Sequence, residues 1–135
     1  MRLSSSPESS RQERADRLRR ERAGAQALRV AHPAVRQLRL ELTFDSPSVN
    51  TPAAQSHVLH PAARAFFEFS CPYADCDGGF DLTTAVNAAL ASEGGKAVGT
   101  LECAGHRPQR QGSRSPCKLQ LTYAIAATYN LNQTL

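Results

Sequence analysis

The chain has 135 residues, enough for one domain plus an extension, with 41% hydrophobic residues and a formal net charge of +4. Residues 1–8 contain no apolar run, and no stretch approaches the roughly 18 apolar residues that a membrane span requires. We therefore expect neither a secretory signal nor a membrane helix, and a cytoplasmic location.

The charge is unevenly divided along the chain. Residues 1–40 hold ten arginines and four acidic residues, a net of +6, whereas residues 41–135 hold six basic and eight acidic residues, a net of −2. Arginine outnumbers lysine by 14 to 2, which reflects a GC-rich coding sequence as much as any function. We predict a basic N-terminal arm over 1–35, a domain over 36–130 and a frayed C-terminus over 131–135.

The arm carries weak helical signals. Ser10 and Glu13 have the spacing of a capping box, and Glu13 and Arg17 stand four residues apart. The apolar face of such a helix is thin, and a helix that buries little is marginal in water. The sequence predicts a poorly ordered or partly helical arm, and the alternative is an arm that becomes ordered on nucleic acid or an acidic partner.

Two strands are expected before the first cysteine. Residues 38–44 alternate apolar and polar side chains, which predicts a half-buried strand. Residues 46–61 carry three prolines among polar residues and are interpreted as a long loop. A second strand is expected over 64–70, running directly into Cys71.

One helix and two further strands are expected after the first cysteines. Residues 82–90 carry apolar side chains at helical spacing, with Asp81 as N-cap and two glycines at 94–95 as the stop. Residues 97–103 and 119–127 read as strands. The predicted fold class is α+β, an antiparallel sheet of order β-β-α-β-β with one packed helix.

Four cysteines dominate the second half of the chain: Cys71, Cys76, Cys103 and Cys117. In a reducing compartment they favour metal ligands over disulfides or unrelated buried thiols. Four residues separate the first pair, so one turn can present both sulfurs to an ion. Thirteen residues separate the second pair, which suits the bases of two hairpin strands. We expect one structural Zn²⁺ per chain.

With four cysteines and flanking strands, residues 64–128 resemble the zinc-ribbon class, in which two β-hairpins clamp a zinc ion. The resemblance implies a small bacterial zinc-ribbon-like protein. The chain departs from that class by lacking Cys-x-x-Cys knuckles and by carrying a helix between the ligand pairs. His106, three residues after Cys103, is an alternative fourth ligand to Cys117.

No catalytic pattern is present. The zinc deaminase signature, the nucleophile elbow, the P-loop and the dinucleotide-binding glycine motif are all missing from the sequence. Asp75, Asp77 and Asp81 cluster near the first cysteine pair, where they fit turns and a helix cap. We expect a protein that is not an enzyme.

Two binding hypotheses remain. The 106–116 loop contains no acidic residue, and with its flank it offers candidate phosphate contacts in Arg107, Arg110, Arg114 and Lys118. This pattern, together with the basic arm, favours nucleic acid, although it also fits an ordinary solvated loop. The alternative is a protein partner or homodimer docked on an open sheet face that includes Phe66, Ala124 and Ala126.

Overall fold

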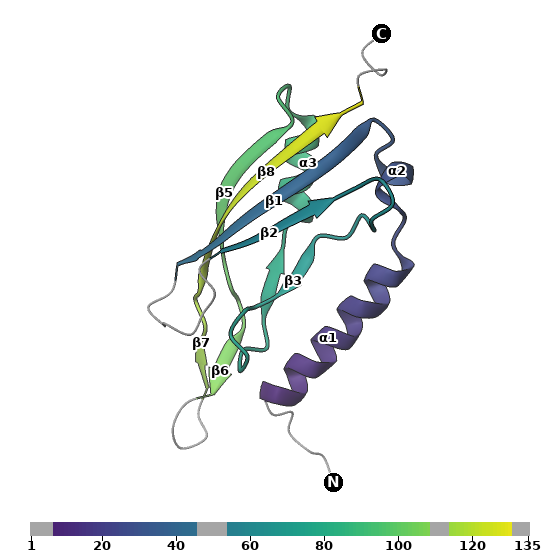
Figure 1. The fold of residues 1–135 in the computed structure, drawn as a ribbon. Helices are drawn as coiled ribbons and strands as arrows, with labels where there is room; N and C mark the ends of the chain where they lie inside the picture. Colours follow the sequence, from purple (N-terminus) through teal and green to yellow (C-terminus); the bar gives the residue numbers. More distant parts are fainter. Residues whose placement is uncertain (1–6, 46–53, 109–113, 131–135) are drawn as a thin grey trace.

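The computed structural model describes residues 7–45, 54–108 and 114–130, and Figure 1 shows their arrangement. The helices are α1 (Pro7–Gly24), α2 (Leu28–Ala31) and α3 (Thr83–Ala91). The strands are β1 (Val35–Asp45), β2 (Ala54–Leu59), β3 (Glu68–Ser70), β4 (Gly79–Asp81), β5 (Lys96–Glu102), β6 (His106–Pro108), β7 (Arg114–Pro116) and β8 (Gln120–Tyr129).

The fold is mixed α+β and is built on a four-stranded antiparallel sheet of order β2-β1-β8-β5. Two short antiparallel ladders, β3-β4 and β6-β7, extend from one end of it. In Figure 1, α3 lies behind the sheet, whereas α1 lies beside β3 and away from the long strands. The predicted fold class is confirmed.

Strand β1 forms the centre of the sheet because its apolar residues alternate. Leu38, Leu40 and Leu42 all point to the buried face, while the residues between them are exposed or half-buried. The neighbouring strand β8 has the same alternation, and its register places Ile125 opposite Leu40. The two strands with the clearest alternation in the sequence therefore pair with each other.

Helix α3 covers the apolar face of the sheet. Ala85, Val86 and Ala89 recur at helical spacing and are buried, as the sequence predicted. At the start of the helix, Asp81 Oδ1 accepts hydrogen bonds from the backbone N–H and the hydroxyl of Thr83, at 3.0 and 2.6 Å.

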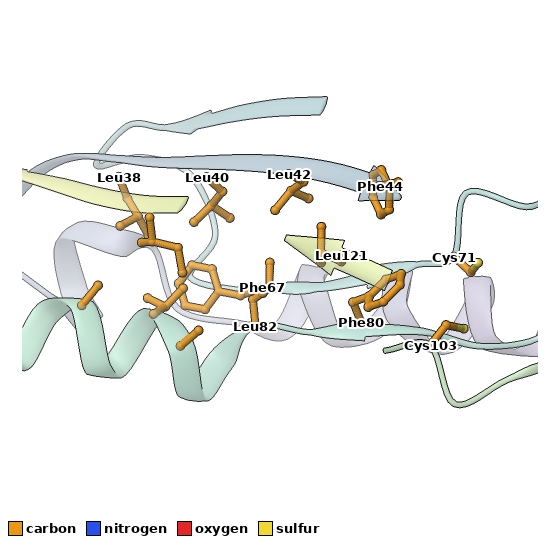
Figure 2. Packing of buried hydrophobic residues seen from close by; sticks show 14 of the residues in the cluster. Leu38, Leu40, Leu42, Phe44, Phe67, Cys71, Phe80, Leu82, Cys103 and Leu121 are labelled. Atoms are coloured by element: carbon orange, nitrogen blue, oxygen red, sulfur yellow. The ribbon is translucent and has the colours of Figure 1, made fainter. Parts of the chain in front are cut away.

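The core continues from α3 toward the cysteines. In Figure 2, a row of side chains from β1 faces Phe67, Leu82 and Phe80, with Cys71 and Cys103 at one end of the same layer. The rings of Phe44 and Phe80 meet with centroids 5.8 Å apart. The thiols are thus continuous with the hydrophobic core.

Two sequence predictions were wrong about the second strand of the sheet. Residues 54–59, which were predicted to lie in a loop, form strand β2 at an edge of the sheet. Pairing with β1 satisfies the backbone hydrogen-bonding groups along one side of this polar strand. The strand predicted over 64–70 is reduced to residues 68–70 and pairs with β4 rather than joining the sheet. The strands predicted at 97–103 and 119–127 correspond to β5 and β8.

Helix α1 lies against the domain despite its thin apolar face. Leu18 is only 4% exposed, and polar contacts hold the rest of the helix. The guanidinium groups of Arg14 and Arg17 both reach Glu68 Oε2 on β3, at 2.8 and 2.9 Å. No helix in the described part of the chain is long and apolar enough to cross a membrane. The predicted frayed end, 131–135, lies outside the described residues.

Candidate metal centre

The structure brings the four cysteine thiols into one cluster. All four Sγ atoms lie within 4.8 Å of one another. Cys71 Sγ is 3.8 Å from Cys117 Sγ, and Cys76 Sγ is 3.6 Å from Cys103 Sγ. A tetrahedral ion with metal–sulfur bonds of about 2.3 Å holds its sulfurs about 3.8 Å apart, so the spacing fits a Zn²⁺-sized ion. The thiols are free, without disulfides.

Two β-hairpins supply the thiols in pairs. Cys71 and Cys76 lie in the connection between β3 and β4, whose ladder brings Ser70 opposite Gly79. Cys103 and Cys117 lie where the β5-β8 ladder ends and the β6-β7 ladder begins. The thirteen residues that separate this second pair in the sequence are therefore accounted for by a hairpin that continues past the cysteines.

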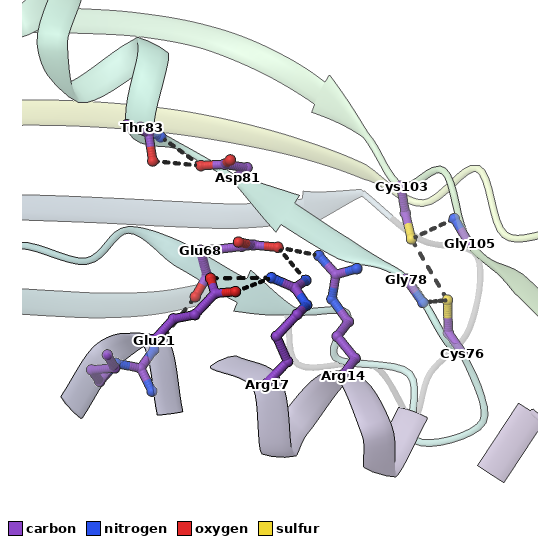
Figure 3. A network of polar contacts seen from close by, with 11 residues as sticks. Arg14, Arg17, Glu21, Glu68, Cys76, Gly78, Asp81, Thr83, Cys103 and Gly105 are labelled. Atoms are coloured by element: carbon purple, nitrogen blue, oxygen red, sulfur yellow. Dashed lines mark hydrogen bonds and ion pairs between the residues drawn. The ribbon is translucent and has the colours of Figure 1, made fainter. Parts of the chain in front are cut away.

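Two glycine turns pack against each other beside the sulfurs. The N–H of Gly78 donates to Cys76 Sγ at 3.3 Å, and the N–H of Gly105 donates to Cys103 Sγ at 3.4 Å (Figure 3). A Cβ on Gly78 would lie 2.6 Å from Gly105 Cα, so neither position admits a side chain without displacement. The arrangement places N–H donors on two sulfurs, where they stabilise thiolate charge.

Sequence reasoning missed these glycines, although a signal was present. Two of the four cysteines are followed two residues later by glycine, in Cys76-Asp77-Gly78 and again in Cys103-Ala104-Gly105. The repeated Cys-x-Gly pattern places one small residue in each turn at the point of closest approach. This repeated pattern is a more specific sign that the two hairpins pack together than the spacing of the cysteines is.

Arg11, from α1, reaches the backbone of the first cysteine turn. Its Nη1 donates to the carbonyl oxygens of Cys71 and Tyr73, both at 2.8 Å, and of Cys76 at 3.2 Å. The N–H groups of the turns thus face sulfur, and the carbonyl groups face a cation. This contact ties the N-terminal helix directly to the geometry of the cysteines, and nothing in the sequence pattern pointed to it.

The thiols perturb one another's acidity. Hydrogen bonds from the thiols of Cys71 and Cys76 lower the pKa of Cys103 to about 4. The same contact with Cys103 raises the pKa of Cys71 and of Cys76, and burial raises the pKa of Cys117. The thiols therefore share a tendency to carry one negative charge, and a bound cation would be needed to hold all four as thiolates.

His106 lies beside the cluster but points elsewhere. Its side chain is exposed, and its backbone N–H donates to Asp77 Oδ1 at 2.7 Å. The four sulfurs that converge are those of Cys71, Cys76, Cys103 and Cys117.

The structure describes only some of the residues that were predicted to contact nucleic acid. Arg107 is turned inward: its Nε is 2.7 Å from Asp75 Oδ1, and its guanidinium carbon is 3.7 Å from the centroid of the Tyr73 ring. Arg110 lies outside the described residues, and Arg114 belongs to β7 without a described side chain. Lys118 is exposed, with a left-handed backbone at φ 57°.

The open apolar face was partly mispredicted. Phe66 precedes β3 and is half-buried under Arg22, whose guanidinium carbon is 5.0 Å from the ring centroid. It is therefore not part of a sheet face with Ala124 and Ala126, which lie on β8.

Comparison with known proteins adds no relative. No protein-family model, no curated protein and no solved structure matches this chain significantly. The geometry alone defines the class: a mixed α+β domain with a four-cysteine cluster able to hold a metal ion.

Proposed function

We propose that the cluster holds one structural Zn²⁺ and that the domain it stabilises is a non-enzymatic nucleic-acid-binding module of the zinc-ribbon type. The supporting observation is the convergence of four sulfurs within 4.8 Å of one another. Thiolates are ligands that zinc prefers, and four of them complete a tetrahedral shell. A complete shell leaves no open position for substrate or water, which favours a structural role over a catalytic one.

The fourth ligand is Cys117 rather than His106 in this proposal. Cys117 Sγ already lies 3.8 Å from Cys71 Sγ, whereas the imidazole of His106 is on the surface. Ligation by His106 would require the turn after Cys103 to reorganise and would cost the hydrogen bond to Asp77. A zinc site made of thiolates needs reduced cysteines, so a cytoplasmic location is part of the same proposal.

The contacts of Arg11 fit a charged metal site. Four thiolates and one Zn²⁺ carry a net charge of about −2. A guanidinium on the adjacent carbonyl groups partly offsets that charge and fixes the turn that carries two of the ligands. Binding of the metal and docking of α1 therefore support each other.

The distribution of arginine contacts supports nucleic acid as the partner. Several arginines are engaged internally, such as Arg17 with Glu68 and Arg107 with Asp75. Among the described residues, the exposed side chains of Arg29 and Arg36 form no ion pair with a carboxylate. Arginines without such a partner are available for phosphate.

A binding assay tests this proposal. Fluorescence anisotropy with a fluorescein-labelled 12-nucleotide single strand would be measured at about 50 mM and about 200 mM salt. We expect binding at low salt that weakens steeply as salt rises, because contacts to phosphates release counterions. Absence of binding at low salt, or binding that is unchanged by salt, would contradict nucleic acid as the partner.

A second candidate is a protein partner or homodimer on the outer face of the sheet. Val58 and Val98 are exposed on that face, Val98 at 77%, and Ala124 on β8 lies opposite Val98. Association through these side chains would be insensitive to salt. Light scattering at low and high salt separates this candidate from the first.

A further inference from the structure

A cavity of about 580 Å³ is lined by residues of the edge strand β2, of the segment that leads into β3, and of the C-terminal end of α1. Its volume falls within the range of about 300–1,000 Å³ that small-molecule pockets occupy. It lies apart from the cysteines, none of which lines it, and no acidic side chain lines it either.

Aromatic rings form part of the cavity wall. The rings of His57 and Phe69 meet with centroids 4.8 Å apart at an interplanar angle of 35°. Phe66 also lines the cavity, with the guanidinium of Arg22 5.0 Å from its ring centroid. The pocket wall is therefore partly aromatic, with Arg22 over the Phe66 ring and His57 against the Phe69 ring, and a nucleobase can stack on a wall of this kind.

Two guanidinium groups complete the wall, and each is held by a single main-chain carbonyl. Arg22 Nη2 donates to the carbonyl of Glu68 at 3.4 Å, and Arg64 Nη1 donates to the carbonyl of Ala25 at 2.8 Å. Within the described part of the chain neither has a carboxylate partner, in contrast to Arg14 and Arg17. Each guanidinium has five N–H donors, so most of its hydrogen-bonding capacity remains for a ligand.

We propose that this pocket binds one nucleotide of a single-stranded nucleic acid. The base stacks on the rings of Phe66 and Phe69, and the phosphate takes paired hydrogen bonds from Arg22 and Arg64. A single strand is the favoured ligand because a base inside a duplex is stacked on both faces and enters a pocket only after it is flipped out, at a cost in unstacking and unpairing. This assignment rests on the proposed function, and it names the part of the surface that would bind the nucleic acid.

The test uses the zinc-loaded full-length protein and the fluorescein-labelled 12-nucleotide strand. Phe66→Leu keeps apolar volume but removes the ring, and Arg64→Gln removes one charge. We expect each to weaken binding about tenfold, and Arg64→Gln to lower the salt dependence by about 0.7 in log–log slope. The matched control is Lys96→Gln, because Lys96 is an exposed cation on β5, at the opposite edge of the sheet.

The outcomes separate this inference from the proposed function. If the wild type binds the strand and both pocket variants bind like the control, nucleic-acid binding stands and the pocket assignment is wrong. If Arg64→Gln weakens binding but Phe66→Leu does not, the pocket takes an anion without a stacked base, and the nucleotide assignment is wrong.

If the wild type does not bind the strand, the proposed function fails, and titration with adenosine monophosphate then decides the pocket. Shifts in the NMR signals of the His57 ring that disappear in Arg64→Gln would support a nucleotide pocket. Absence of such shifts would overturn it.

Discussion

Gly78→Ala tests the packing of the two cysteine turns. The added Cβ would lie 2.6 Å from both Cα and N of Gly105 and 2.7 Å from Cys103 Sγ. Ordinary contact begins near 3.4 Å, so the turns must separate by about 0.8 Å, the difference between 3.4 and 2.6 Å. Main-chain atoms and the buried Cys103 sulfur cannot rotate away as a flexible side chain can. We therefore expect a loss of about 3 kcal/mol in unfolding free energy, at the upper end of overpacking costs.

The same displacement moves sulfur atoms out of tetrahedral spacing. If the loss of about 3 kcal/mol falls entirely on metal binding, it corresponds to roughly 100-fold weaker zinc affinity. Competition with a chromophoric chelator measures the affinity, and urea unfolding measures the stability.

The matched control for this prediction is Gly94→Ala. No atom lies within 4 Å of the Cβ that it adds, and Gly94 does not have positive φ. We expect it to be neutral or to stabilise by about 0.4–1 kcal/mol. Equal stability and zinc affinity for Gly78→Ala and Gly94→Ala would refute the argument that the turns are in direct contact.

Three further predictions follow from the same structure. Arg11→Ala removes the hydrogen-bond donor to three carbonyl groups and should weaken zinc affinity about 10–100-fold, measured by competition with a chelator. The control is Arg19→Ala, on the exposed side of α1, which should leave zinc affinity unchanged. Leu121→Ala, at a fully buried position of β8, should lower the unfolding free energy by about 2–5 kcal/mol, against less than about 0.5 kcal/mol for Val98→Ala. Zinc affinity should fall at least about tenfold per unit decrease in pH. The reason is that the pKa of the Cys71 thiol is raised, so the metal must displace at least one proton to bind. An affinity that stays constant from pH 7.5 to 5.5 would exclude thiolate ligation.

The spacing of apolar residues predicted those helices and strands that bury one face against the core. The alternation of β1 and β8 and the apolar stripe of α3 follow from burial on a single side, so their residues contain the information needed to place them. Strand β2 could not be predicted in this way, because Gln55, Ser56 and His57 are held by pairing with β1 rather than by an apolar pattern.

The cysteines were identifiable from composition and spacing, but their surroundings were not. The docking of α1 depends on Arg11 and Glu68, which meet partners more than 50 positions away in the sequence. Charged side chains carry no periodic signal that reveals such partners. The same holds for Arg107, a basic loop residue predicted to contact phosphate, because its contacts with Asp75 and Tyr73 had no signal in the sequence.

The proposed function depends first on four cysteines that hold one structural zinc ion. Native mass spectrometry on protein purified under reducing conditions, before and after chelation, tests it most directly when circular dichroism is recorded on the same samples. We predict one zinc per chain and loss of the folded spectrum on removal, because metal binding at such sites contributes an apparent ~10–16 kcal/mol in small metal-folded peptides. Protein that carries no metal and remains folded with four free thiols would contradict the account.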